Sequence, residues 1–244
     1  MTINVLINGA KGRMGGEAVK AVGQDPACRV AGQTDREDNL PRVLAELRPD
    51  VVVDFTQPDA AYPNALAIIQ AGGRPVIGTT GLTEEQIAHL TALCAEKKLG
   101  GLIAPNFAIG AVLMMRFSAE AARHLPHVEI IELHHDQKIE APSGTAIKTA
   151  QMIQAARPVP PPPKVREVEL SPGARGTAEY SVPIHSVRLP GHVAHQEVIF
   201  GGLSERLTIR HDSIHRESFM PGVVLSVKKV METDRLVYGL EHFL

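Results

Sequence analysis

The stretch INVLINGAKGRMGGEAVKAVGQ, from Ile3 to Gln24, decides how the chain begins to fold. Its first part is short, apolar and β-branched, as buried parallel strands are, and its last part has apolar residues at helical spacing. Between the two lie glycines at positions 9, 12 and 15. Such glycines permit a tight turn, close approach of the backbone to a pyrophosphate, and packing of the helix near the sheet. The spacing is GxxGxxG rather than the commoner GxGxxG, so ordinary tight turns remain an alternative to dinucleotide binding.

A second strand-like run, CRVAGQTD, strengthens the dinucleotide interpretation. It ends at Asp35, about 20 residues beyond Gly15, where an acidic side chain would accept hydrogen bonds from the adenosine ribose. The next residue is Arg36, which could instead meet a 2′-phosphate. The two residues together predict a site for NADH, NADPH or both.

Strand-like and helix-like segments continue to alternate up to about residue 105. Further strands are expected at Val51–Thr56, Arg74–Thr80 and Gly100–Asn106, with apolar segments of helical spacing between them. Gly72 and Gly100 are expected as helix C-caps, and Thr83 is expected to begin a helix. This alternation predicts an α/β fold with a Rossmann-like, doubly wound parallel sheet.

The pattern changes after Asn106. A long helix is expected at 110–125, a strand at 127–136 and a second helix from Ser143, followed by a β-rich segment of antiparallel character at 178–213. The proline-rich stretch RPVPPPPKV, 157–165, predicts an extended loop or a docking motif. We therefore expect a dinucleotide-binding domain over 1–105, rejoined by 217–244, and an α+β substrate domain with an open mixed sheet over 106–216.

Composition excludes several classes of protein. The 244 residues are 44% hydrophobic and carry a formal net charge of -2, which argues against nucleic acid or an anionic membrane as partner. The two cysteines, Cys28 and Cys94, form no CxxC pair, so neither a disulfide framework nor a thiolate zinc site is expected. Without a secretory signal or a long apolar run, the chain is expected to be soluble and cytoplasmic.

The block ELHHDQK, from Glu132 to Lys138, carries the residues suited to proton transfer. Neighbouring residues on a strand point to opposite faces, so His134 and His135 cannot share a site unless the strand ends there. One interpretation makes one of them a structural histidine and Lys138 a solvated charge. A second is a metal site, because there are eleven histidines and Glu132 and Asp136 lie nearby, although no known ligand spacing is present. The third is delivery of a proton to a substrate that has accepted hydride.

The next block, PSGTA, favours the third interpretation. Ser143, Gly144 and Thr145 stand where a helix begins, and free amides at a helix N-terminus are a receptor for a carboxylate. The sequence thus predicts an anion anchor within reach of proton donors, and no bound metal.

At these residues the chain resembles the 4-hydroxy-tetrahydrodipicolinate reductase (dihydrodipicolinate reductase) family. ELHHDQKIEAPSGTA resembles the family signature, and VLINGAKGRMG, VVVDFTQP, VIGTTGL and APNFAIGAVLM follow the family's order in the N-terminal half. SVRLPGHVAHQEVIFGGLSERLTIRHDSIHRESFMPG resembles the C-terminal half more loosely. Glu140 replaces the usual aspartate. In the loop 186–197, which shapes the sheet, Leu189, Pro190 and Val193 to His195 also depart from many members.

The resemblance implies an activity and a role for each site residue. The expected reaction is hydride transfer from NAD(P)H to a cyclic imine dicarboxylate, giving tetrahydrodipicolinate, in a homotetramer assembled through the substrate-domain sheets and with a hinge between domains. His134 would be the proton donor and acceptor, Lys138 the proton donor and His135 a substrate contact, while Gly144 and Thr145 would bind the substrate carboxylate. The implied cofactor-binding residues are Gly9, Ala10, Lys11, Gly12, Arg13, Met14, Gly15, Asp35, Arg36, Gly78, Thr79, Thr80, Ala104, Pro105, Asn106 and Phe107.

Two other classes fit part of the pattern. A sugar or amino-acid dehydrogenase on a similar two-domain plan would share the glycine loop, but the HHxxK and SGT block weighs against it. A non-catalytic nucleotide-binding regulator would share the fold, but the intact His134 and Lys138 weigh against that.

Overall fold

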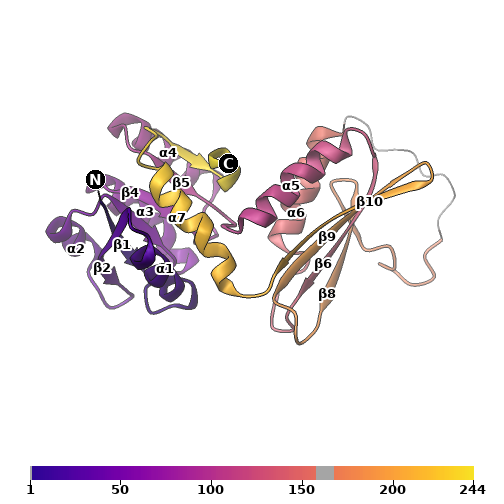
Figure 1. The fold of residues 1–244 in the computed structure, drawn as a ribbon, viewed down its shortest axis with the longest axis horizontal. Helices are drawn as coiled ribbons and strands as arrows, with labels where there is room; N and C mark the ends of the chain where they lie inside the picture. Colours follow the sequence, from indigo (N-terminus) through magenta and orange to yellow (C-terminus); the bar gives the residue numbers. More distant parts are fainter. Residues whose placement is uncertain (1, 158–167) are drawn as a thin grey trace. The chain divides into compact units, whose positions relative to one another are not determined.

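The computed structural model describes residues 2–157 and 168–244, and the chain divides into two compact units (Figure 1). The first unit runs to Ile109 and is completed by Arg216–Leu244, and the second is Gly110–His215. The sequence-based boundaries were 105/106 and 216/217. Most of the proline-rich stretch at 157–165 lies outside the described residues, so neither interpretation of it is tested.

The first unit is built on a six-stranded sheet in the order β11-β5-β4-β3-β1-β2, and every pair in it is parallel. Its strands are β1 (Ile3–Asn8), β2 (Cys28–Thr34), β3 (Val51–Asp54), β4 (Arg74–Ile77), β5 (Gly101–Ile103) and β11 (Leu236–Tyr238). The predicted doubly wound sheet is confirmed. Its strand order reverses between β1 and β3, and ligands of such sheets bind beyond the carboxyl ends of the strands at that point.

Helices cover this sheet, and apolar side chains fill the space beneath them. The helices are α1 (Arg13–Gln24), α2 (Leu40–Leu47), α3 (Pro58–Gln70), α4 (Glu84–Lys97) and α7 (Met220–Lys229), with short 3₁₀ turns at η1 (Arg216–Phe219) and η2 (Leu240–Phe243). α1 packs against α7, while α3 packs between α2 and α4. Leu6, Leu44, Ile68 and Leu90 are buried in one cluster between this second group and the sheet.

Helix ends follow the sequence signals in two of three cases. Thr83 caps α4 through a reciprocal capping box with Gln86, and Gly72 follows α3 with a positive φ of 84°, as a C-terminal glycine does. Gly100 is not a cap, because α4 already ends at Lys97 and Lys98 takes the left-handed conformation. A Cβ on Gly100 would lie 2.0 Å from the carbonyl oxygen of Val230, so close backbone packing explains this glycine.

The segment after β5 belongs to the first unit for a packing reason. The Phe107 ring is buried and contacts Phe55 edge-to-face, with 5.7 Å between ring centroids. Gly222 of α7 packs so closely on the Phe107 carbonyl that a Cβ there would be 2.0 Å away. These contacts place the boundary of the unit after Ile109 rather than before Asn106.

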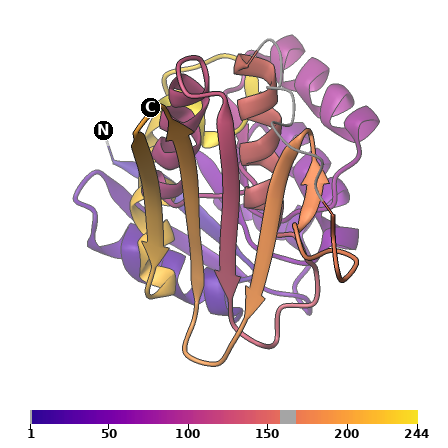
Figure 2. The ribbon, with the colours of Figure 1, turned by 90° about the vertical axis from the view of Figure 1, so that its right-hand side faces the viewer.

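The second unit contains a five-stranded sheet in the order β10-β9-β6-β8-β7, covered on one face by α5 (Ile109–Ala122) and α6 (Gly144–Ala156) (Figure 2). Its strands are β6 (His127–His134), β7 (Thr177–Glu179), β8 (Val182–Arg188), β9 (Ala194–Gly202) and β10 (Glu205–Ser213). β6 and β8 are parallel and the other pairs are antiparallel, so the predicted mixed sheet is confirmed. Alternate residues such as Val128, Ile130 and Glu132 are buried on one face, and among the described residues of this unit no helix lies over the other face.

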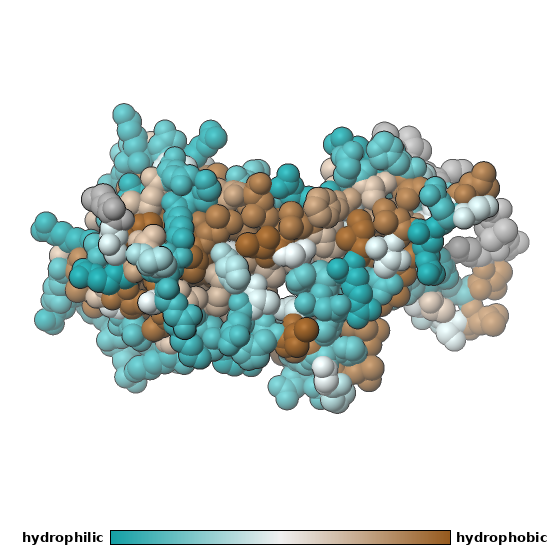
Figure 3. Space-filling model, viewed as in Figure 1, coloured by the Kyte–Doolittle hydropathy of each residue, from teal (hydrophilic) through white to brown (hydrophobic). Residues whose placement is uncertain are grey.

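The hydropathy of the surface is that expected of a protein with an apolar core and a polar exterior. In the view of Figure 3 the periphery of the first unit is mostly hydrophilic. Among the residues that the structure describes, none of the helices has the length and apolar character needed to cross a membrane.

Candidate active site

The glycine loop has the geometry expected of a phosphate cradle. Gly9 follows β1 with φ of 80°, and a Cβ there would lie 2.5 Å from the carbonyl oxygen of Phe55. A Cβ on Gly15 would lie 2.0 Å from the carbonyl oxygen of Gly9, so the first turn of α1 packs directly on the loop. Gly12 is the N-cap of α1, and no side chain caps the helix there. The amides of the first helical turn therefore face the position where a pyrophosphate would bind.

Asp35 lies directly after β2 and is bound to this loop. Its carboxylate accepts the Lys11 backbone N–H at 2.9 Å and the Arg36 backbone N–H at 2.8 Å. The hydrogen bonds from Arg36 and Lys11 hold the pKa of Asp35 below its usual range. Arg36 itself is exposed. The acid and the base are thus adjacent at the end of the second strand, as the sequence predicted.

The other predicted cofactor segments follow β4 and β5 at the same edge of the sheet. Gly78 packs on the Phe55 ring so closely that a Cβ would lie 2.2 Å away, and Thr80 is exposed. Thr79 is buried, and its hydroxyl donates to Asp54 at 2.9 Å instead of facing solvent. After β5, Ala104 and Phe107 are buried whereas Pro105 is exposed. Asn106 is half-buried, and its side-chain oxygen accepts the Ala108 N–H at 2.8 Å. The remaining predicted residues lie in the loop and first turn after β1: Ala10 is buried, Met14 is half-buried, and Lys11 and Arg13 are exposed.

Asp54 joins these segments, and the sequence analysis did not single it out. Its fully buried carboxylate accepts the Asn8 amide at 2.7 Å, the Asn64 amide at 2.9 Å and the Thr56 hydroxyl at 2.7 Å, besides Thr79. These uncharged donors connect the carboxyl ends of β1, β3 and β4, because all of them donate to the same carboxylate. The sequence feature that could have identified Asp54 is its place at the end of the apolar run VVVD.

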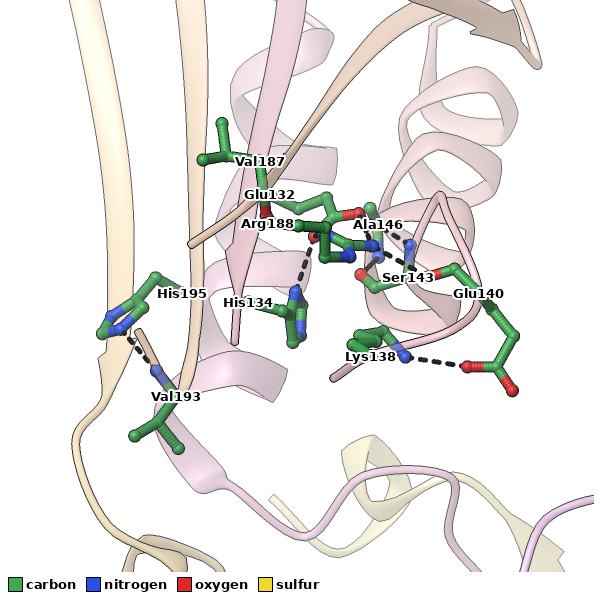
Figure 4. Close-up of polar contacts among 10 residues, drawn as sticks. All are labelled: Glu132, His134, Lys138, Glu140, Ser143, Ala146, Val187, Arg188, Val193 and His195. Atoms are coloured by element: carbon green, nitrogen blue, oxygen red, sulfur yellow. Dashed lines mark hydrogen bonds and ion pairs between the residues drawn. The ribbon is translucent and has the colours of Figure 1, made fainter. Parts of the chain in front are cut away.

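In the second unit, β6 ends at His134. His135 therefore lies outside the strand, which is the condition under which the two histidines can share one site. A turn follows, in which the Lys138 backbone N–H donates to the His135 carbonyl at 3.2 Å. The His134 side chain is 14% exposed and that of Lys138 is 22% exposed, with Lys138 Nζ 3.3 Å from Glu140. The Lys138 side chain is therefore partly buried, and its ammonium group points toward Glu140 (Figure 4).

Glu132 connects His134 to the rest of this site (Figure 4). Its carboxylate is fully buried and lies 2.6 Å from His134 Nδ1, while Arg188 donates to both of its oxygens at 2.8 and 2.7 Å. Burial alone would raise the pKa of Glu132, but hydrogen bonds from His134, Arg188 and Ser186 lower it to about 2. The sequence analysis considered Glu132 only as a neighbour in a metal site and missed Arg188, which lies 56 residues away.

The start of α6 differs from the prediction at one residue. Gly144 and Thr145 form the first turn, and a Cβ on Gly144 would meet nothing within 4 Å, so the space above it is open. Ser143 does not present a free amide, because its N–H donates to Glu132 at 3.1 Å and its hydroxyl caps the Ala146 N–H at 3.2 Å. The predicted anion anchor would therefore be centred on Gly144 and Thr145, since Ser143 serves as the cap of the helix.

The alternative of a metal site receives no geometric support. Within residues 2–157 and 168–244, no group of three or more His, Cys, Asp or Glu side chains is arranged to hold a metal ion. The carboxylate of Glu132 is instead surrounded by hydrogen-bond donors.

Family comparisons match each of the two units of the chain. A family model described as "Dihydrodipicolinate reductase, N-terminus" matches residues 3–107, and one described as "Dihydrodipicolinate reductase, C-terminus" matches residues 110–244. The chain belongs to the dihydrodipicolinate reductase family. The resemblance carried by the HHxxK and APSGTA motifs is thereby confirmed.

Individual relatives of this family match over the full length. The chain is 51% identical to a 4-hydroxy-tetrahydrodipicolinate reductase of Coxiella burnetii (strain Dugway 5J108-111), covering 100% of both chains. It is 52% identical to one of Enterococcus faecalis, covering 99% of this chain and 100% of the relative. Among solved structures, a dipicolinate-bound dihydrodipicolinate reductase from Paenisporosarcina sp. TG-14 superposes with a TM-score of 0.92 at 45% identity, covering 100% of both chains. An amine dehydrogenase from Mycobacterium smegmatis, with a TM-score of 0.66 at 12% identity, shares the fold alone.

Proposed function

We propose that this chain reduces a cyclic imine dicarboxylate, 4-hydroxy-tetrahydrodipicolinate or dihydrodipicolinate, to tetrahydrodipicolinate in lysine and diaminopimelate biosynthesis. One observation carries the proposal beyond family membership: a single carboxylate, Glu132, binds both His134 and the residue that caps α6. It thereby holds the proton-handling group and the helix N-terminus close to each other. A substrate carboxylate at Gly144 and Thr145 would lie against the first turn of that helix.

The chemistry balances with the groups that the chain supplies. When bound, the reduced nicotinamide supplies a hydride, which carries two electrons and one proton to the unsaturated ring. A second proton comes from the side of His134 and Lys138. With dihydrodipicolinate the net change is the addition of one hydride and one proton; with 4-hydroxy-tetrahydrodipicolinate the 4-hydroxyl group also leaves as water. Lys138 also provides positive charge beside a dianionic substrate, while Gly144 and Thr145 orient one carboxylate by their amides.

The first unit fits a dinucleotide, and we infer that either NADH or NADPH binds there. Gly9 and Gly15 leave space that any Cβ would fill, and the first turn of α1 has no side-chain cap. Asp35 suits the ribose hydroxyls of NADH and Arg36 suits the 2′-phosphate of NADPH. Three other predicted cofactor residues are also exposed. Lys11 and Arg13 lie in the loop and first turn after β1, and Thr80 follows β4 at the same edge of the sheet.

We also infer a cytoplasmic homotetramer that assembles through the sheet of the second unit, without nucleic acid or membrane as partner. The face of this sheet opposite α5 and α6 carries apolar residues that are half-buried in the single chain. They are Ile131 and Leu133 of β6, Val187 of β8 and Ile199 of β9. An uncovered apolar sheet face of this kind is stabilised when a second copy covers it.

A substrate panel tests the proposed activity. The enzyme should oxidise NADH or NADPH with freshly generated cyclic imine dicarboxylate, and not with amino acids, sugars or their keto analogues. Turnover confined to a sugar or amino acid would favour the dehydrogenases that share the fold. Binding of the cofactor without turnover of any substrate would favour a nucleotide-binding regulator.

A further inference from the structure

We propose that Glu132 is a positioning residue that fixes the tautomer of His134, so that Nε2 is the nitrogen presented to substrate, and that Arg188 holds Glu132 in place for this purpose. The inference rests on the proposed function, because it assigns a role within the same site. It concerns two residues, one on β6 and one on β8, that do not themselves contact the substrate in this account.

The direction of the hydrogen bond to His134 follows from what else surrounds the carboxylate. Glu132 Oε2 accepts from Arg188 Nη1 at 2.8 Å, and Oε1 accepts from Arg188 Nη2 at 2.7 Å and from the Ser143 N–H at 3.1 Å. A carboxylate that receives this many donors is ionised and can only accept. The 2.6 Å contact between Glu132 Oε2 and His134 Nδ1 therefore has Nδ1–H as its donor. The proton that His134 gives or takes must then move at Nε2.

Arg188 is placed by the register of the sheet. β6 and β8 are parallel, and His134 pairs with Arg188 as the last residue of each strand. Nη1 and Nη2 of the guanidinium both donate to the Glu132 carboxylate, and Nη2 also donates to the Glu140 carbonyl at 2.8 Å. One side chain thus holds Glu132 and the turn that carries Lys138, as the labelled residues of Figure 4 show. Such a planar, bidentate contact resists rotation of the carboxylate, which a single-point cation would not do.

The same strand provides a matched control. Glu129 also lies between a histidine and an arginine, with His185 Nε2 at 2.8 Å and Arg175 as the ion-pair partner. Because it is three residues earlier on β6, it points to the opposite face of the sheet, away from α6. A general effect of removing a histidine-bound carboxylate from β6 will appear in Glu129→Gln as well as in Glu132→Gln. An effect on positioning will appear only in Glu132→Gln.

The first test uses the unmodified full-length protein and needs no altered carboxylate. Nitrogen-15 NMR of labelled histidine distinguishes the two neutral tautomers, and the His134 signals are those lost in His134→Asn. We expect the proton of neutral His134 on Nδ1, with Nε2 bare. In Glu132→Gln the Nε2–H form should become populated, and in Glu129→Gln the His134 signals should be unchanged. A neutral His134 that carries its proton mainly on Nε2 in the unmodified protein would overturn the proposal, even if Glu132→Gln does not fold.

The second test is kinetic. Glu132→Gln should lower kcat by at least about tenfold, as loss of an orienting carboxylate does, with KM for the cofactor unchanged. Glu129→Gln should keep the wild-type kcat. Equal losses in both variants, or wild-type kcat in Glu132→Gln, would contradict the positioning role. Absence of reductase activity in the unmodified enzyme would instead refute the proposed function, and the tautomer measurement would still decide the assignment of Nε2.

Discussion

At the scale of single residues, Lys138 is the side chain whose role the proposed reaction tests most simply. Its ammonium group lies 3.3 Å from Glu140 in a turn next to His134. If it donates a proton only in the transition state, Lys138→Ala should lower kcat on the order of 10²-fold while cofactor affinity is preserved. Steady-state kinetics and cofactor titration measure the two quantities.

A second lysine serves as control for this prediction. Lys229 forms a comparable pair with Glu232 at 2.6 Å, in the other unit of the chain. Lys229→Ala should keep the wild-type kcat. Wild-type turnover in Lys138→Ala would mean that this lysine is only a solvated charge, the interpretation that the sequence left open.

Cofactor choice depends on two neighbouring residues with opposite preferences. Asp35 would repel the 2′-phosphate of NADPH, and Arg36 would pair with it. We expect dual use, with the two kcat/KM values within about tenfold, which corresponds to ~1.4 kcal/mol. Arg36→Ala should reduce kcat/KM for NADPH more than for NADH, and most strongly at low salt. Asp35→Ala should do the reverse, and an unchanged NADH/NADPH ratio in both variants would place these residues away from the ribose.

At the scale of structural elements, Glu132 links β6, β8 and α6, and it makes their association sensitive to acid. Its pKa falls from an ordinary value of 4.5 to about 2 in the folded protein, against the effect of burial, because His134, Arg188 and Ser186 donate to it. A carboxyl with a lower pKa when folded binds fewer protons in the folded state. Its stabilisation is therefore complete above pH 4.5 and is lost as the pH falls towards 2.

This linkage predicts a specific difference between variants. The free energy of unfolding, measured by urea titration at several pH values, should lose on the order of a few kcal/mol through this group over that range. In Glu132→Gln the acid-dependent loss should be smaller by that amount. Glu46→Gln, which removes an exposed carboxylate paired with Arg42, should leave the acid dependence as in the wild type. A wild-type acid dependence in Glu132→Gln would contradict the assigned contacts.

The elements themselves were largely predictable, because their signals are local. The strand before Gly9, the capping box at Thr83 and the Ser143 cap of α6 each depend on residues within a few positions of one another. The contacts between elements were not predictable from such local signals. Arg188 meets Glu132 only because β8 pairs in parallel with β6, and Asp54 meets Asn8 across 46 residues. Ser143 was placed correctly as a helix start but wrongly as a free amide, since its partner Glu132 belongs to another strand.

At the scale of the whole molecule, the proposed assembly makes a prediction about the open face of the second sheet. Light scattering should give about four chain masses in solution, and Ile199→Lys should lower this value. A lysine at this position lies opposite Glu129 within the sheet, so the single unit tolerates it. Leu203→Lys, at a turn residue that is 96% exposed, should keep the tetramer. An unchanged mass in Ile199→Lys would place the interface elsewhere.

The most direct test of the account is the transfer of hydrogen from cofactor to substrate. The enzyme is mixed with freshly generated cyclic imine dicarboxylate and with NADH or NADPH that carries deuterium at both positions of the transferring carbon, and the product is analysed by mass spectrometry. The account predicts tetrahydrodipicolinate with one deuterium for each cofactor oxidised, at a rate that Lys138→Ala lowers. Unlabelled product, or an imine that stays unreduced while the reduced cofactor is bound, would contradict it.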